Sequence, residues 1–224
     1  MYCVPCALLG DEAGFPPSVE KWRGLVSRYA GDIPVDFLLA WIQRESGGNP
    51  CSYTTLRESG IFQLMPPDNT NQGGTTEAAL RAACSGSSQS AARQLTSDEL
   101  DEQVKSGIRY VNYLRGKAHG KLVAAGVTWD ESNPDFWRIV KLQHAYPAPT
   151  AGWLATAAAR LGRPPASWAE MRAANPTARA DVLDNAEWVG GFGVGGGAAS
   201  PLKFMILLGG IGVLAALAYR HSRH

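Results

Sequence analysis

Glu45 stands in a sequence environment that favours acid–base chemistry. It lies in the last turn of an apolar helix predicted over residues 34–46, with Trp41 and Ile42 one turn earlier on the same face. Burial among apolar side chains disfavours an ionised carboxylate, and the negative end of the helix dipole acts in the same direction. Both effects predict a raised pKa, which suits a general acid near neutral pH. A solvated glutamate, or one paired with Arg44, is the plainer interpretation.

Three short segments follow one another in an order that is more specific than Glu45 alone. Residues 45–50 read ESGGNP, residues 59–66 read SGIFQLMP, and residues 145–146 read AY at the end of a later helix. Together they resemble the soluble lytic transglycosylase and goose-type lysozyme family. That family has Glu-Ser then Asn-Pro, a Gly-Leu-Met-Gln-Leu-Met-Pro type segment, and Ala-Tyr-Asn-Ala-Gly. The first two segments match well and the third in part, over roughly residues 35–152.

The resemblance implies roles for four residues and a one-carboxylate mechanism. Glu45 corresponds to the catalytic acid and Ser46 to a serine that hydrogen-bonds within the site. Gln63 corresponds to a residue of the sugar-binding cleft, and Tyr146 to a tyrosine near the catalytic carboxylate. The acid would protonate the oxygen between N-acetylmuramic acid and N-acetylglucosamine. Its carboxylate would then take the proton of the muramoyl C6 hydroxyl, which closes on C1 to give a 1,6-anhydro product, with no metal or other cofactor.

The chain departs from the family pattern at two positions and offers one further carboxylate. Pro147 and Pro149 stand where the family usually has asparagine and glycine. Because proline lacks an amide donor and fixes φ, this difference affects substrate positioning more than the acid. Ordinary glycosidases use two carboxylates, and Glu58 is the nearest second acid for a lysozyme-like hydrolysis. A surface loop charge near Arg57 is the alternative interpretation of Glu58.

Cysteines and a histidine are the remaining candidates. Cys51 and Cys84 can form a disulfide that closes the intervening loop in an oxidising compartment, or they can be two buried thiols. Cys3 and Cys6 have CxxC spacing without a second ligand pair, which predicts a local disulfide or free thiols rather than a metal or redox site. His144 is predicted to be structural or exposed.

Apolar periodicity, capping residues and proline positions predict helices throughout the body of the chain, and no segment shows sustained alternation typical of strands. Thr96 with Glu99 forms a capping box, and Asn133 before Pro134 marks another helix start. We therefore expect an all-α, lysozyme-like domain over residues 15–189. The predicted helices cover residues 18–29, 34–46, 96–114, 133–142, 150–161, 167–174 and 177–189.

Composition and charge exclude several classes of protein. With 224 residues, of which 45% are hydrophobic, the chain can bury a substantial core, which excludes intrinsic disorder. Residues 1–189 carry 18 basic and 20 acidic side chains, so no broad basic surface is available and nucleic acid is not an expected partner. Four cysteines are too few for a disulfide scaffold and lack zinc-finger spacing.

The C-terminal part predicts a tether and a membrane anchor. Residues 190–200 contain six glycines and no charge, which is typical of a flexible linker. Residues 201–220 are predicted to form one transmembrane helix. The 19 residues from Pro201 span about 28 Å if Lys203 extends towards the interface, whereas a buried core helix is the alternative. The basic residues 221–224 place this tail on the cytoplasmic side, and residues 1–14 lack an ordinary signal peptide.

These expectations combine into one functional hypothesis with alternatives. The chain is expected to be a membrane-anchored lytic transglycosylase whose partners are peptidoglycan glycan strands and a lipid membrane. Because no export signal is present, delivery within a larger assembly is expected, with a bacteriophage virion that aids genome entry preferred over a secretion or conjugation machine. The alternatives are a catalytically impaired structural membrane protein of such an assembly and a hydrolytic goose-type lysozyme.

Overall fold

The structure is a computed structural model that describes residues 14–54, 57–74, 80, 84 and 95–194. In these residues the regular structure is helical, and extended backbone is limited to isolated bridges between Tyr53 and Ser59 and between Ser59 and Leu64. The all-α prediction is thereby confirmed for the described part of the chain. The helices are α1 (Pro17–Glu20), α2 (Arg23–Tyr29), α3 (Val35–Ser46), α4 (Pro66–Asn71), α7 (Ser97–Ala124), α8 (Pro134–Ala145), α9 (Pro147–Leu161), α10 (Trp168–Ala173) and α11 (Ala180–Gly190).

Most helix boundaries lie where local chemistry predicts them. The Thr96 side chain accepts from the Glu99 amide, and the Glu99 side chain accepts from the Thr96 amide, so the capping box begins α7. Asn133 caps α8, with Pro134 in the first helical position, and Ser167 caps α10.

Several boundaries differ from the predicted ones. Helix α7 ends at Ala124 rather than at residue 114, α8 ends at Ala145 rather than at residue 142, and α11 begins at Ala180 rather than at residue 177. The helix predicted over residues 18–29 is split into α1 and α2 around Lys21 and Trp22. Helix α9 begins at Pro147 rather than at residue 150, since proline is well suited to the first helical position. Helix α4 was not predicted; it begins with Pro66 and Pro67 and is too short to show apolar periodicity.

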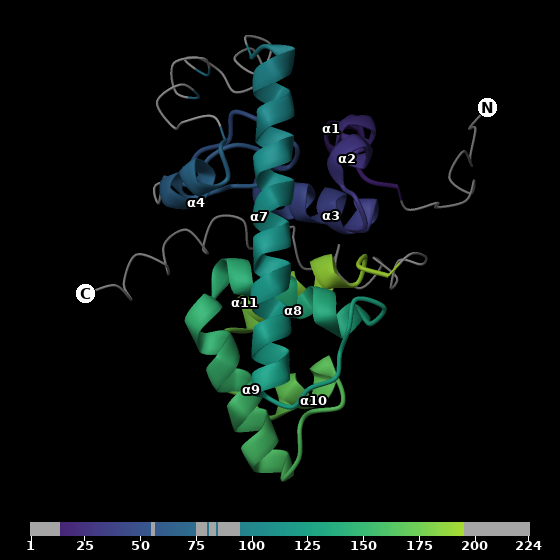
Figure 1. Ribbon diagram of the computed structural model, residues 1–224, viewed down its shortest axis with the longest axis vertical. Helices are drawn as coiled ribbons and strands as arrows, with labels where there is room; N and C mark the ends of the chain where they lie inside the picture. Colours follow the sequence, from purple (N-terminus) through teal and green to yellow (C-terminus); the bar gives the residue numbers. More distant parts are fainter. Residues whose placement is uncertain (1–13, 55–56, 75–79, 81–83, 85–94, 195–224) are drawn as a thin grey trace, which may run out of the picture. The chain divides into compact units, whose positions relative to one another are not determined.

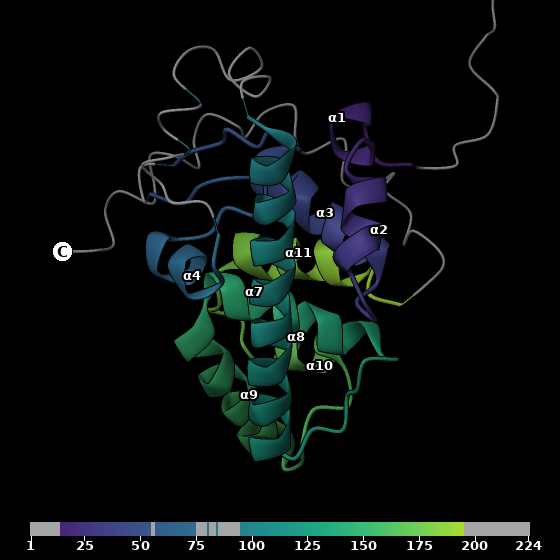
Figure 2. The same ribbon diagram turned by 45° about the horizontal axis from the view of Figure 1, so that its top comes forward.

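Helix α8 is the central element of the packing. It contacts α7, α9 and α11, and its residues are buried almost continuously from Asp135 to Gln143. Helix α7, the long vertical helix of Figure 1, crosses α8 and packs against α2 and α4, which lie on opposite sides of it (Figures 1 and 2). A charged residue in α8 therefore has to find its partner inside the protein.

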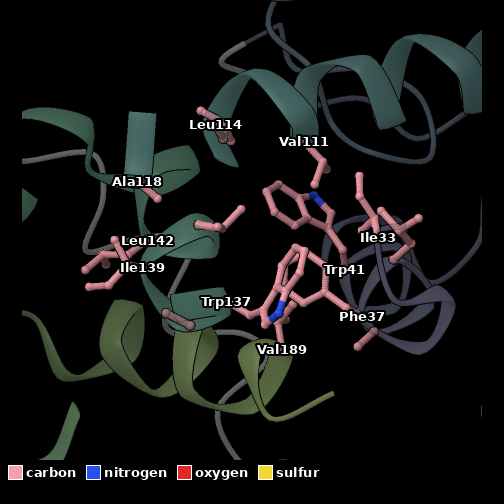
Figure 3. Close-up of a cluster of buried hydrophobic side chains, with 14 of the residues drawn as sticks. Ile33, Phe37, Trp41, Val111, Leu114, Ala118, Trp137, Ile139, Leu142 and Val189 are labelled. Atoms are coloured by element: carbon pink, nitrogen blue, oxygen red, sulfur yellow. The ribbon is translucent and has the colours of Figure 1, made fainter. Parts of the chain in front are cut away.

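The core around Trp41 joins α3 to α7, α8 and α11. Phe37 and Trp41 of α3 meet Trp137 of α8, and Val111 of α7 and Val189 of α11 border the same cluster (Figure 3). The ring centroids of Phe37 and Trp137 lie 4.9 Å apart. This packing fixes the C-terminal half of α3 against α8, and thereby the position of Glu45.

The end of the described part packs closely on the body. The Phe192 ring lies 5.3 Å from that of Phe15 and 5.1 Å from that of Trp188. A Cβ added at Gly193 would lie 2.1 Å from the Trp137 ring, so this close approach requires glycine. The packed part thus reaches Val194, five residues into the predicted linker.

None of the described helices is long and apolar enough to cross a bilayer. The transmembrane helix predicted over residues 201–220, the basic tail, the remainder of the linker and the pair Cys3 and Cys6 lie outside the described residues.

Candidate active site

The Glu45 carboxylate forms a buried ion pair with Lys141 of α8. The Lys141 ammonium donates to Glu45 Oε1 and lies 4.1 Å from the centroid of the Trp41 ring. The side chain of Lys141 is 2% exposed and that of Glu45 is 16% exposed, so most of the pair's exposed surface belongs to the Glu45 side chain. The ammonium is stabilised by the carboxylate and by the face of the indole.

His144, one turn after Lys141, links Glu45 to α7. Its Nε2 atom lies 3.7 Å from Glu45 Oε1, and its Nδ1 atom lies 3.4 Å from the Tyr110 hydroxyl. The His144 side chain is 10% exposed, so of the two predicted settings, structural or exposed, the exposed one does not hold. We call Glu45, Lys141, His144 and Tyr110 the Glu45 cluster.

The structure corrects the expected protonation of Glu45. Burial does act to raise its pKa, as the sequence predicts, but the Lys141 ammonium and His144 outweigh burial, and the pKa is held well below its usual range. The predicted raised pKa is therefore wrong, because Lys141 was not foreseen. Burial also lowers the pKa of Lys141, which opposes the favourable effect of Glu45 on the ammonium.

Further carboxylates surround the Tyr110 hydroxyl. Burial, with the charges of Asp68, Glu45 and Glu58 among the further causes, raises the pKa of Tyr110. The pKa of Asp68, at the start of α4, is raised by partial burial, against the opposing effects of His144 and Tyr110. Glu58 accepts a hydrogen bond of 2.9 Å from the Thr54 hydroxyl, so it is more than an isolated loop charge.

Ser46 connects the end of α3 to the segment that carries Gln63. The Ser46 hydroxyl lies 2.9 Å from the Ile61 carbonyl and 3.2 Å from the Ile42 carbonyl, positions from which it can donate to either. Gly47, with φ of 61°, ends the helix, and a Cβ at Gly48 would lie 2.0 Å from the Ser18 carbonyl. The first two predicted motif segments are therefore in direct contact.

Gln63 is buried within its own turn. It is 1% exposed, has a positive φ of 51°, and donates from Nε2 to the carbonyls of Ser52 and Gly60 at 3.0 and 2.6 Å. Its buried Oε1 atom has no hydrogen-bond partner among the described residues. The described contacts of Gln63 shape the turn, and none reaches Glu45.

The turn at residues 59–64 rests on α7. The Ile61 amide donates to Gln103 Oε1 at 3.2 Å, and the Phe62 ring packs where a Cβ at Gly107 would lie 2.1 Å from it. Gly107 thus allows the ring to approach the helix backbone.

Tyr146 occupies the junction of α8 and α9. Its hydroxyl accepts from Arg179 at 2.8 Å, and its ring stacks on Trp153 with centroids 6.0 Å apart. No described contact joins Tyr146 to Glu45. Pro147 and Pro149 lie in the first turn of α9, where their missing amide donors are not needed by the helix, and the Pro147 carbonyl accepts from Lys121.

A disulfide joins Cys51 and Cys84, with 5.6 Å between their Cα atoms. It closes the part of the chain that contains the turn at residues 59–64 and helix α4, which fits an oxidising compartment. The sequence left open whether Cys51 and Cys84 form a disulfide or remain two buried thiols, and in the structure they form a disulfide.

Two further features bear on ligands. Within the described residues, no group of three or more His, Cys, Asp or Glu side chains is arranged to hold a metal ion. A surface hollow of about 470 Å³ lies away from Glu45, bordered by Gly126–Trp129, Asn133 and Arg163–Ala166. It shares no lining residue with the Glu45 cluster.

No protein-family model, curated protein or solved structure matches the chain.

Lys141 is the residue that the sequence analysis missed. It stands between Val140 and Leu142 in a helix that is apolar on most sides, three positions before His144. A lysine inside such an apolar run indicates a buried ion pair, because an ammonium in a buried helix requires an acidic partner.

Proposed function

We propose that this protein cleaves the β-1,4 bond between N-acetylmuramic acid and N-acetylglucosamine in peptidoglycan, with Glu45 as acid and base. The observation that carries the proposal is the contact between the two motif segments. The Ser46 hydroxyl lies 2.9 Å from the Ile61 carbonyl, so the end of α3 that bears Glu45 is joined to the glutamine-containing turn. Two of the segments that resemble the family in sequence thus meet next to the residue that carries the carboxylate.

The preferred reaction is a lytic transglycosylation. Protonated Glu45 gives its proton to the glycosidic oxygen while the bond from that oxygen to C1 breaks. The Glu45 carboxylate then removes the proton of the C6 hydroxyl as the oxygen of that hydroxyl bonds to C1. The proton returns to Glu45, and neither water nor a metal ion is consumed.

A specific observation favours a second candidate, a structural membrane protein that has lost activity. The carboxylate of Glu45 is ionised in its pair with Lys141, and an ionised carboxylate cannot donate a proton. A hydrolytic, lysozyme-like reaction would need a second carboxylate, for which Glu58 and Asp68 are candidates because both, like Glu45, act on the Tyr110 hydroxyl.

We also propose that the enzyme works from a membrane. The apolar residues 201–220 would anchor it, and a tether would raise its effective concentration at the cell wall without tighter binding. Delivery within a bacteriophage virion that aids genome entry is part of this proposal. Recovery of the protein from host envelopes but never from phage particles would remove the virion from this proposal.

Mass spectrometry of muropeptides released from purified sacculi by the full chain tests the reaction. Products about 18 Da lighter than the hydrated forms, the mass of one water, are expected from transglycosylation, and hydrated products would identify a lysozyme. No product from the folded wild-type protein would favour the structural candidate.

The inactive control must keep the fold. Glu45→Gln alone leaves the Lys141 ammonium buried and unpaired, whereas Glu45→Gln/Lys141→Met removes both charges. The double variant should be folded and inactive. Activity in either variant would exclude Glu45 as the acid. Glu58→Gln should remain active if the reaction uses one carboxylate.

A further inference from the structure

We propose that Lys141 is a positioning residue that holds the proton Glu45 delivers, so that the Glu45–Lys141 pair as a whole is the acid of the site. This inference rests on the proposed function and explains how a carboxylate that is ionised in the free protein can act as an acid. A glycan that covers Glu45 would move the proton from the ammonium to the carboxylate.

The contact between the two groups allows direct transfer. The Lys141 ammonium donates to Glu45 Oε1 with no atom between them, and Lys141 is almost fully buried. The remaining exposure of the pair, 16% of the side chain, belongs to Glu45, which is the surface that a sugar would cover. Loss of the last water at the carboxylate disfavours both charges, and the neutral amine and carboxylic acid then become the better pair.

The step is balanced within the pair and the substrate. The bond from Lys141 Nζ to one hydrogen breaks as Glu45 Oε1 gains that proton, which leaves a neutral amine and a carboxylic acid. Glu45 passes the proton to the glycosidic oxygen and later recovers one from the C6 hydroxyl. The amine takes up that proton when product leaves and water returns, which restores the ion pair.

Other charged or titratable groups face this pair from each neighbouring element. Arg44 adds a second positive charge near Glu45 and Lys141. The charge of Asp184 of α11 acts on Arg44 and favours its charged form. Glu58 acts on Lys141 with the opposite sign. The full set comprises Arg44 from α3, Glu58 from the turn, Asp68 from α4, Tyr110 from α7, His144 from α8 and Asp184 from α11.

Two substitutions of Lys141 separate proton holding from a structural role. Lys141→Arg keeps a positive charge beside Glu45 but does not release a proton, so kcat should fall about 100-fold or more. Lys141→Met removes the group that holds the proton and leaves buried Glu45 as the only acid of the pair, so the alkaline limb of kcat/KM should move to lower pH by about one unit or more while activity persists.

A purely structural ion pair predicts the reverse order. Arginine would then rescue activity and methionine would abolish it, and that result would overturn the inference. Lys105→Met is the matched control, because Lys105 pairs with Glu102 near the surface of α7, away from the Glu45 cluster; its pH profile should equal that of the wild type. Circular dichroism confirms that each variant is folded.

Infrared difference spectra test the proton position without any turnover. The spectrum of the free wild-type protein minus that of the free Glu45→Gln/Lys141→Met variant should show the bands of an ionised Glu45. After an N-acetylglucosamine oligomer is added to both proteins, the same difference should show the band of a protonated carboxyl group. Lys141→Met should show that signal in the free protein near neutral pH. An ionised Glu45 in free Lys141→Met, or in the saturated wild-type complex, would overturn the inference. A protein with these spectra but no cleavage of sacculi would instead contradict the proposed function.

Discussion

The Glu45 cluster has a counterpart of similar composition at the protein surface. In this surface cluster, Arg115 of α7 donates to Asp32 at 2.6 Å and pairs with Glu131, while His119 lies 3.0 Å from Glu131. Carboxylates, a cation and a histidine thus occur together twice along α7 and its neighbours.

Water distinguishes the two clusters. Asp32 is 72% exposed, His119 46% and Glu131 32%, whereas Lys141 is 2% exposed. Charges that remain hydrated gain little from pairing, because water already stabilises each of them. In the Glu45 cluster each charge depends on its partner, so a change in one group alters the protonation of the other. Burial, more than residue type, is what makes Glu45 a candidate for chemistry.

One-sided removal of charge should show the largest difference between the clusters. Glu45→Gln leaves Lys141 charged in the interior, and the free energy of unfolding should fall by about 3–5 kcal/mol. Glu131→Gln should cost no more than about 1 kcal/mol, since Arg115 keeps Asp32 and water. Urea unfolding followed by circular dichroism measures both.

The double variant completes this test. Glu45→Gln/Lys141→Met should recover most of the lost stability, because neutral side chains of similar size replace both charges. Equal losses in Glu45→Gln and Glu131→Gln, with no recovery in the double variant, would mean that the Glu45 pair is as hydrated as the surface cluster.

Much of the fold could be predicted because its helices have local start and stop signals. Thr96 with Glu99, Asn133 with Pro134, and Gly47 mark helix ends through interactions within a few residues. Helix α4 was missed, and the break between α1 and α2 was not foreseen. Apolar periodicity sets neither helix α4 nor the break between α1 and α2. Helix α4 has only six residues, and at the break Trp22 donates to the carbonyl of Gly48, which is distant in sequence.

The site could be predicted only as far as its local segments reach. Glu45 and Ser46 are neighbours in sequence, and Ser46 contacts the turn at residues 59–64, the second segment of the resemblance. The pair of Glu45 with Lys141 joins residues 96 positions apart, and it depends on how α3 packs against α8. The prediction of a raised Glu45 pKa is wrong for that reason. The sequence indicated that Glu45 is buried, but it did not indicate the compensating charge of Lys141.

Acid should weaken both clusters, with the stronger effect at Glu45. The folded-state pKa of Glu45 lies below its ordinary value of 4.5, so its stabilising contribution is complete above that pH and is lost as pH falls through the folded pKa. The pKa of Glu131 is also lowered, by its hydrogen bond from Arg115 and by His119, which gives the same sign. Below about pH 4.5, unfolding free energies should therefore fall more steeply with decreasing pH for wild type than for either neutralised variant. The difference should be larger for Glu45→Gln/Lys141→Met than for Glu131→Gln.

Salt should produce the smallest effect and affect only the surface cluster. At about 1 M salt the Debye length is about 3 Å, so charges in contact with solvent are screened and buried pairs largely are not. The cost of Glu131→Gln in urea unfolding should shrink towards zero between low salt and about 1 M sodium chloride, whereas the cost of Glu45→Gln should be nearly constant. If the stability cost of Glu45→Gln changed with salt concentration, that result would mean that ions and water reach Lys141. The carboxylate would then be hydrated in the free protein, and covering it with a sugar would have to remove far more water than the 16% exposure of Glu45 implies.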